Sequence, residues 1–234
     1  MKNIYAFLVL TMVVLNSRAQ FSSDNLHPMA LCNATGNQTN IQVLDDGSGG
    51  YFVFWLDNRL DAGKKQVYAQ HLDQDGLAQW AADGKVLTDT GRNTTGYRVA
   101  AWQSGVLLSW FQQGFTNAHD TVFCKYISSA GSDLWAQPTT VAYSGNGFLY
   151  MDLPGFNIFP NDSGAFIVHS YTYTGGSSGL TYNRIDFNGN LRWPALSKTQ
   201  TLYGYDYRSQ TDNQNGFCLV ERKWCGIYHV YTAF

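Results

Sequence analysis

The sequence places apolar residues in short runs, where they often alternate with polar ones, and separates the runs with Gly, Asp, Asn and Ser. Alternation with a period of two is typical of a half-buried β-strand. No apolar stripe with a helical period extends beyond one turn, and no capping box precedes one. The pattern therefore predicts an all-β chain of short antiparallel strands.

Three consecutive regions each contain four such runs. In the first, the expected strands are Ile41–Leu44, Tyr51–Leu56, Val67–Leu72 and Lys85–Leu87. In the second they are Tyr97–Ala101, Val106–Phe111, Thr121–Ile127 and a strand near Val141. In the third they are Asn157–Phe159, Ala165–Tyr171, Leu180–Ile185 and Leu196–Thr199. The regions are thus interpreted as copies of one unit.

Two landmarks keep their spacing from copy to copy. One is a glycine before an apolar strand, found at Gly50, Gly105, Gly164 and Gly216. The other is a turn in which Asp or Ser is followed by Gly and then Trp. It is found as Asp73, Gly76 and Trp80, as Ser128, Gly131 and Trp135, and as Asp186, Gly189 and Trp193. A repeat of roughly 50 residues with four antiparallel strands is typical of a β-propeller blade. The sequence therefore predicts a β-propeller-like array of four-stranded blades.

The repeat also predicts roles for its own residues. The tryptophan is expected to lie between neighbouring blades, where it fills the gap left by twisted sheets. The Asp or Ser is expected to accept hydrogen bonds from backbone N–H groups of its turn. A catalytic carboxylate would not recur once per copy, so these landmarks are interpreted as structural.

The same spacing divides the chain. The expected segments are a signal peptide at 1–19, a lead-in at 20–37, repeats at 38–90, 91–145 and 146–200, and a partial fourth repeat at 201–234. Closed propellers have about four to eight blades. Three complete copies and a beginning therefore predict a truncated array. Its expected partners are the remaining blades of a longer chain, or a second copy joined through the terminal edge strand.

The N-terminus has the layout of a cleavable secretory signal. Lys2 supplies the positive charge, Ile4–Leu15 the apolar stretch, and Ser17 to Ala19 a small-x-small cleavage site. No other segment is long and apolar enough to span a bilayer. The prediction is a secreted or cell-surface protein. A net charge of −2 gives no electrostatic footprint for nucleic acid.

Four cysteines allow two readings in an exported chain. Cys32, Cys124, Cys218 and Cys225 could form two disulfides, with three connectivities, or remain as buried free thiols. None belongs to a Cys-x-x-Cys pair, and no Cys or His spacing suits a metal. No metal site and no cofactor is expected.

A resemblance adds to this reading. The segment Asp45–Arg59 (DDGSGGYFVFWLDNR), followed by Val67–Asp73 (VYAQHLD), Gly76 and Trp80, resembles the repeats of exported bacterial β-propeller-like proteins. Many of those proteins end in a sorting domain for type IX secretion, which is not visible here. The resemblance covers about residues 38–220 and implies fold and location rather than activity. The Asp/Gly/Trp turn is also similar, more weakly, to the tryptophan-docking turn of quinoprotein propellers.

Two groups of residues are candidates for binding. Asp57 and Arg59 end a strand where loops could gather, although an Asp–Arg pair that braces the hairpin is the alternative. His71, Tyr126 and Arg184 share one strand position and are expected on a solvent or groove face. Tyrosine suits stacking on sugars or contact with protein surfaces, and a tyrosine-rich set comprises Tyr171, Tyr173, Tyr203, Tyr205 and Tyr207. The alternative is that these tyrosines have no ligand.

Two function classes remain. No Ser-His-Asp order, nucleophile elbow, HExxH or P-loop is present. We therefore expect a non-catalytic surface or secreted module that binds a glycan or a protein. The alternative is a propeller hydrolase acting on glycans, with an Asp-based site near the central axis. That alternative predicts close carboxylates, one of them with a raised pKa.

Overall fold

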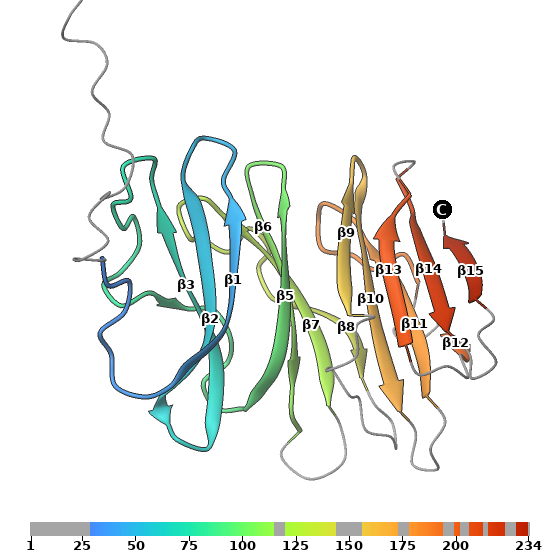
Figure 1. Ribbon diagram of the computed structural model, residues 1–234, viewed down its shortest axis with the longest axis horizontal. Helices are drawn as coiled ribbons and strands as arrows, with labels where there is room; N and C mark the ends of the chain where they lie inside the picture. Colours follow the sequence, from blue (N-terminus) through green and yellow to red (C-terminus); the bar gives the residue numbers. More distant parts are fainter. Residues whose placement is uncertain are drawn as a thin grey trace, which may run out of the picture.

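The computed structural model describes residues 29–114, 120–143, 156–172, 178–193, 199–201, 206–212, 215–222 and 228–233. Within these ranges all regular secondary structure is β, in strands that form four antiparallel sheets (Figure 1). The prediction of an all-β antiparallel fold is therefore confirmed. The predicted signal peptide lies outside the described residues. No helix long and apolar enough to cross a membrane is found in the part of the chain that is described.

Neighbouring strands in each sheet are also neighbours in sequence. The first sheet contains β1 (Gln38–Asp45), β2 (Tyr51–Asp61), β3 (Lys64–Leu72) and β4 (Lys85–Val86). The second contains β5 (Thr94–Trp102), β6 (Gly105–Gln112), β7 (Thr121–Ser128) and β8 (Thr139–Tyr143). The third contains β9 (Asn157–Asn161), β10 (Gly164–Thr172), β11 (Ser178–Ile185) and β12 (Thr199–Thr201). The fourth contains β13 (Asp206–Thr211), β14 (Phe217–Arg222) and β15 (Tyr228–Ala233).

This topology gives the molecule two different ends. Because the first three sheets each have four antiparallel strands, the first strands of all sheets run in the same direction. At one end lie the tight turns after the first and third strands, at the top of Figure 1; we call this the turn end. At the other lie the last residues of the second strands and the first residues of the third strands; we call this the loop end. Among the first strands, β5 contacts both β1 and β9 across sheets.

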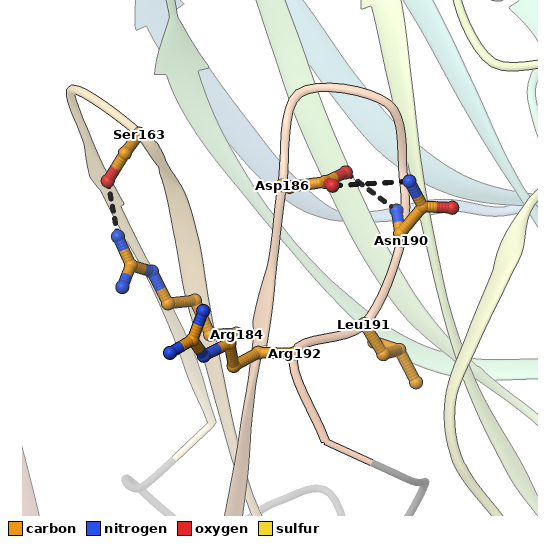
Figure 2. Close-up of a pocket in the computed structure, with 6 residues that line it drawn as sticks. All are labelled: Ser163, Arg184, Asp186, Asn190, Leu191 and Arg192. Carbon is orange, nitrogen blue, oxygen red and sulfur yellow. Dashed lines mark hydrogen bonds between the residues drawn. The ribbon is translucent and has the colours of Figure 1, made fainter.

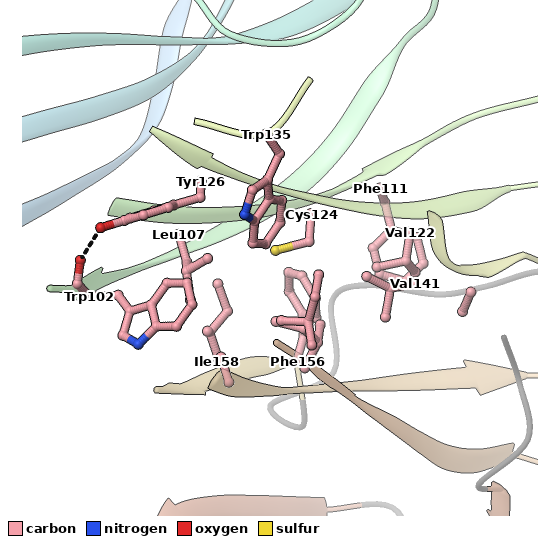
Figure 3. Packing of buried hydrophobic residues seen from close by; sticks show 14 residues of the cluster. Trp102, Leu107, Phe111, Val122, Cys124, Tyr126, Trp135, Val141, Phe156 and Ile158 are labelled. Carbon is pink, nitrogen blue, oxygen red and sulfur yellow. Dashed lines mark hydrogen bonds between the residues drawn. The ribbon is translucent and has the colours of Figure 1, made fainter. Parts of the chain in front are cut away.

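The core consists of layers of side chains between successive sheets. Between the first and second sheets, the shared cluster includes Phe52, Phe54, Val106, Leu108 and Trp110. Between the second and third sheets, a further cluster includes Leu107, Phe111, Phe156, Ile158 and Ile167 (Figure 3). Because alternate residues of one strand point to opposite faces, each central strand contributes to two layers. This accounts for the nearly continuous apolar runs in the sequence.

The repeated glycines before the second strands lie where two backbones approach closely. A Cβ atom placed on Gly50 would lie 2.2 Å from the carbonyl oxygen of Leu72, and one on Gly105 would lie 2.2 Å from that of Ile127. In the third sheet the same clash involves Gly164, whose φ is +154°. No side chain fits at these positions, so the chain requires glycine at the start of each of these strands.

The first two repeated tryptophans lie between sheets. The Trp80 indole N–H donates to the carbonyl of Ser129 at 3.0 Å, and that of Trp135 donates to Phe187 at 2.9 Å. In both cases the acceptor belongs to the corresponding turn of the next sheet. The first sheet is thus fastened to the second through one indole, and the second to the third through another.

The glycines of the repeated turns have a second role that the sequence analysis did not predict. Gly131 and Gly189 have φ values of +80° and +83°, as their turns require. The tryptophan ring of the preceding sheet also packs against each of these glycines. A Cβ atom on Gly131 would lie 3.0 Å from the Trp80 ring, and one on Gly189 would lie 2.8 Å from the Trp135 ring. These glycines therefore belong to the contacts between sheets as well as to their own turns.

The third repeated tryptophan, Trp193, has different described contacts. Its ring meets the Tyr182 ring edge-on at 6.0 Å, and its carbonyl accepts a hydrogen bond from the Asn183 side chain at 3.0 Å. Both partners belong to its own sheet, and no corresponding turn follows β15 among the described residues. The expected position between two blades is therefore observed for the first two tryptophans, whereas for Trp193 it stays a prediction.

The polar residues of the repeated turns act as expected. The carboxylates of Asp73 and Asp186 accept hydrogen bonds from backbone N–H groups of their turns. In the second sheet the Ser128 hydroxyl accepts one from the Ser132 N–H at 3.1 Å. Since all three are engaged with their own backbone, their place in the repeat is structural.

Two details complete the comparison with the sequence. The last strand of the third copy, expected at Leu196–Thr199, begins at Thr199, and residues 194–198 lie outside the described ranges. Cys32, Cys124 and Cys218 are free thiols, whereas Cys225 is not among the described residues. Burial raises the pKa of the Cys124 thiol well above its usual range, which keeps it protonated and unreactive.

Candidate functional site

In the first two sheets, the pairing between the first strand and the second strand is irregular close to the loop end. The pairing of β1 with β2 shifts between Thr39 and Gln42, and that of β5 with β6 shifts between Thr94 and Gly96. Asn40, inside the first irregularity, has a φ of 57°, which is uncommon for a residue other than glycine. The Tyr97 hydroxyl donates to the Asn40 carbonyl and links the two strands. Bulges of this kind are enriched beside active sites, so the loop end is the candidate functional region.

Asp57 lies at this end but faces inward. It is fully buried, and its Oδ2 accepts hydrogen bonds from the Trp55 indole at 2.9 Å and the Gln38 side chain at 3.3 Å. The Arg59 guanidinium contacts the same oxygen at 2.6 Å. Burial alone would raise the pKa of Asp57, but the hydrogen bonds from Arg59 and Trp55 outweigh it and lower that pKa. The lowered pKa favours the ionised form of Asp57, and its Oδ2 is engaged by these three side chains.

Arg59 is as heavily engaged as its partner. Its guanidinium also donates to the Asp83 carbonyl at 2.9 Å and to the Cys32 sulfur at 3.0 Å, and it stacks over the Tyr68 ring with its Cζ 4.0 Å from the centroid. These contacts join the end of β2 to the N-terminal segment and to the loop before β4. The geometry is that of a brace that holds the end of β2 in place.

Asp120 differs from Asp57 in its surroundings. It lies at the loop end, directly before β7, and burial raises the pKa of its carboxyl group, against a lowering effect from the Gly114 N–H, 3.4 Å away. A carboxyl group with a raised pKa is a candidate proton donor. The sequence analysis missed Asp120, because an Asp before a strand is indistinguishable from an ordinary turn residue.

His169 is the second titratable group that sequence reasoning missed. It is 1% exposed on β10, its ring meets Phe111 edge-on at 6.1 Å, and neither ring nitrogen has a hydrogen-bond partner among the described residues. Burial lowers its pKa to about 3, so the ring is neutral. Its place in the chain corresponds to Trp55 and Trp110, which are core residues.

The predicted tyrosine set is only partly placed. Tyr173, Tyr203 and Tyr205 lie outside the described residues. Tyr171 pairs with Gly179 at the end of β10, and Tyr207 pairs with Glu221 near the start of β13, so both backbone positions lie at the loop end. Asp206 begins β13 at that same end.

The residues that share the strand position before the repeated turn lie at the turn end, where each bonds to a residue of its own sheet. Nε2 of His71 lies 2.9 Å from the Asp46 carboxylate, the Tyr126 hydroxyl donates to the Trp102 carbonyl at 3.1 Å, and Arg184 donates to the Ser163 hydroxyl. Tyr126 is 9% exposed. Tyr126 also belongs to the apolar cluster between the second and third sheets, so the expected open face is closed at that position. Among the described residues, no cluster of His, Cys, Asp and Glu could hold a metal ion.

No family model and no curated protein matches the chain. The fold is similar to the endo-arabinase of Bacteroides thetaiotaomicron, with 14% sequence identity, a TM-score of 0.54, and coverage of 88% of this chain and 78% of that one. It also matches an endo-1,4-β-xylanase of the same organism, with 8% identity, a TM-score of 0.44, and coverage of 86% and 72%. The endo-arabinase has a β-propeller fold, so the β-propeller character of the predicted fold is confirmed.

The comparisons correct the first functional expectation. The solved structure that resembles this chain with a TM-score of 0.54 is named as an endo-arabinase, not as a binding or adhesion module. The expectation of a non-catalytic module was wrong because it depended on the absence of local catalytic motifs. In this topology each sheet brings a separate strand end to the loop end, so a site there would be built from residues far apart in sequence.

Proposed function

We propose that this chain is a glycan hydrolase of the β-propeller type, with its catalytic site at the loop end and the four sheets as its blades. The observation that carries the proposal is the likeness of 88% of the chain to a propeller endo-arabinase. Because the identity is 14%, the residues of the site must be argued from this chain alone.

The chemistry would need two carboxyl groups. Glycoside hydrolysis generally uses one carboxylic acid as proton donor and one carboxylate as base or nucleophile, about 5 to 9.5 Å apart. Asp120 suits the acid role because its raised pKa keeps a proton available at higher pH. Asp206 is our candidate for the second carboxylate, since it begins an inner strand at the same end. Asp57 is assigned to neither role, because its charge is already satisfied.

Tyrosines would supply the sugar-binding surface. The backbone positions of Tyr171 and Tyr207 belong to two neighbouring sheets at the loop end. Aromatic rings there would give a polysaccharide a flat surface to stack on. This assignment keeps the sequence prediction of glycan contact and attaches it to a reaction.

The test is hydrolysis by the full chain. Arabinan and xylan are incubated with the wild type and with Asp120→Asn and Asp206→Asn, and new reducing ends are measured. We expect turnover by the wild type and a loss of at least about a hundredfold in kcat for each variant. Asp61→Asn is the matched control: Asp61 lies at the same end, is exposed, and pairs only with Lys64 at 3.2 Å among described salt bridges. Absence of turnover on every glycan, or full activity of both variants, would overturn the proposal.

We also propose export through the N-terminal signal, as the sequence predicts. Expression of the full chain in a bacterial host, followed by N-terminal sequencing of the processed protein, is expected to give Gln20 as the first residue. Retention of Met1 in the cytoplasm would contradict export without affecting the proposed reaction.

A further inference from the structure

A cavity of about 460 Å³ opens at the turn end of the third sheet. It is lined by Ser163, from the turn between β9 and β10, by Arg184 on β11, and by residues of the following turn: Asp186, Asn190, Leu191 and Arg192. Figure 2 shows both guanidinium groups on one side of that turn, while the Asp186 carboxylate points away from them toward Asn190. The cavity lies at the opposite end from the proposed catalytic site and does not depend on it.

The two arginines are direct cross-strand neighbours. Ile185 pairs with Leu191, and the Arg192 N–H donates to the Arg184 carbonyl at 2.7 Å. Like charges placed opposite each other on antiparallel strands destabilise the pair. The fold therefore brings together two positive charges that it would be expected to keep apart.

The other sheets avoid this arrangement at the same position. In the first sheet the Gln79 N–H donates to the His71 carbonyl, and in the second the Leu134 N–H donates to the Tyr126 carbonyl. Each of those pairs has a neutral second member. In the first sheet Asp46 additionally places a carboxylate against His71. Only the third of these sheets combines two arginines with a hydroxyl, that of Ser163, in place of an acid.

No carboxylate in the described part of the chain neutralises the two arginines. The ion pairs found there involve other residues. Asp186 lines the cavity, but it accepts hydrogen bonds from the backbone of Asn190 at 2.8 Å, the backbone of Asn188 at 2.9 Å and the Asn190 side chain at 3.1 Å. These bonds, the one from the Asn190 backbone foremost, lower the pKa of Asp186. Its carboxylate is thus committed to holding the turn.

We propose that this cavity binds an oxyanion between Arg184 and Arg192. A guanidinium group presents paired N–H donors that match the oxygens of a carboxylate or a phosphate. A negative group between the two arginines would replace their mutual repulsion with two charge-assisted contacts. The oxyanion has two sources to distinguish, the carboxylate of an acidic saccharide and free inorganic phosphate.

Calorimetric titration of the full chain tests the site. The probes are galacturonate, inorganic phosphate and, as the neutral counterpart, galactose, all at one ionic strength set with sodium chloride. We expect saturable binding of galacturonate or phosphate and none of galactose. Galacturonate bound more tightly than phosphate would identify an acidic saccharide as the source, and the reverse order would identify free phosphate.

Two variants and a control give the decisive comparison. Arg192→Gln and Arg184→Gln should each weaken binding at least tenfold, whereas Lys64→Gln, which removes one positive charge at the loop end, should leave it unchanged. Arg192 is exposed, so its replacement does not disturb the core. Without the oxyanion, Arg192→Gln should unfold at the same temperature as the wild type or a higher one. Phosphate should raise the melting temperature of the wild type but not that of Arg192→Gln. Binding that Arg192→Gln does not weaken, or no saturable binding of either oxyanion at millimolar concentration, would contradict the proposal.

Discussion

The first and third sheets have the same strand topology but differ in whether their polar and charged side chains are paired with one another. In the first sheet Asp57 pairs with Arg59 at the loop end and Asp46 with His71 at the turn end. In the third sheet neither ring nitrogen of the buried His169 has a hydrogen-bond partner among the described residues, and Arg184 and Arg192 face each other with no described ion pair to a carboxylate. Opposite charges that pair with each other hold a fold together, whereas a charged group without such a partner can bind a ligand. The first sheet is therefore interpreted as a structural support, and the two arginines of the third are the basis of the proposed oxyanion site.

The largest effect expected from this comparison comes from removing Asp57. Asp57→Ala leaves the Arg59 guanidinium without its carboxylate and removes the acceptor of the Trp55 indole. Breaking a buried pair in this way lowers the free energy of unfolding by about 3–5 kcal/mol. Urea denaturation at pH 7 measures it. Asp61→Ala, which breaks an exposed pair, is the control and should change the free energy by less than about 0.5 kcal/mol; equal effects of the two variants would show that Asp57 is no brace.

The tryptophans between sheets give the next largest effect. Trp135 is 6% exposed and joins the second sheet to the third, so Trp135→Ala should cost about 3–5 kcal/mol of unfolding free energy. Trp80 joins the first sheet to the second but is only partly buried, and Trp80→Ala should cost about 1–3 kcal/mol. Thermal and urea denaturation of both variants measures the order. A larger loss for Trp80 would contradict the view that burial, rather than the indole hydrogen bond, sets the strength of each joint.

Replacing His169 should change the free energy of unfolding in the opposite direction. Replacing it with Leu removes two unpaired buried nitrogens and should raise the free energy of unfolding by about 1–3 kcal/mol at pH 7. The pKa of His169 is about 3 in the folded chain and about 6.5 when unfolded. Its neutral form therefore contributes stability above pH ~6.5, and this contribution is lost as the pH falls toward 3.

Stability measured by urea denaturation between pH 7 and pH 4 checks that pH dependence. The wild type should lose more stability over this interval than His169→Leu, because only the wild type gains a proton at this position on unfolding. Identical pH profiles for the two proteins would mean that the ring is not held neutral. A destabilising His169→Leu would mean that the ring nitrogens have partners.

The smallest effect is expected when the third sheet receives a carboxylate at a position where the first sheet already has one. Ser163→Asp places a carboxylate beside Arg184, as Asp46 lies beside His71. The new pair should stabilise the chain by about 0.2–1 kcal/mol and compete with any oxyanion in the cavity. Melting temperatures with and without phosphate measure both effects. If phosphate stabilises Ser163→Asp as much as the wild type, the two arginines do not form the site.

The local part of the fold was open to prediction from sequence. Apolar alternation located the strands, and the spacing of Gly50, Gly105 and Gly164 located the turns, because a close backbone approach admits no side chain there. The candidate site was not open to prediction in this way. The sequence marked Asp57 as a candidate site residue, but it is buried and paired. Asp120 resembled an ordinary turn residue in the sequence, but its carboxyl group has a raised pKa. At Asp57 the hydrogen bonds outweigh burial, whereas at Asp120 burial dominates, and this balance depends on how the strands pack in space.

The repeated turns show the same division within a single motif. Their spacing in the sequence marked Gly131 and Gly189 as turn residues, and their positive φ values agree with that. The sequence did not reveal that each of them also receives a tryptophan from the sheet before it. Trp193 carries the same motif, yet its described ring contact is with Tyr182 of its own sheet. A motif therefore predicts a turn, but the neighbouring sheet decides what the turn contacts.

The sequence by itself determined the all-β character, the repeat and the chemistry of each turn, since these depend on interactions within about ten residues. Only the tertiary structure decided which residues meet: that Trp135 docks on the turn of the next sheet, that His169 lies in the core, and that two arginines share one cavity whose lining carboxylate, Asp186, is engaged with its own turn. The physical reason is that desolvation and charge pairing depend on distances in space. Those distances are set by the stacking of sheets whose corresponding strands lie far apart in the chain.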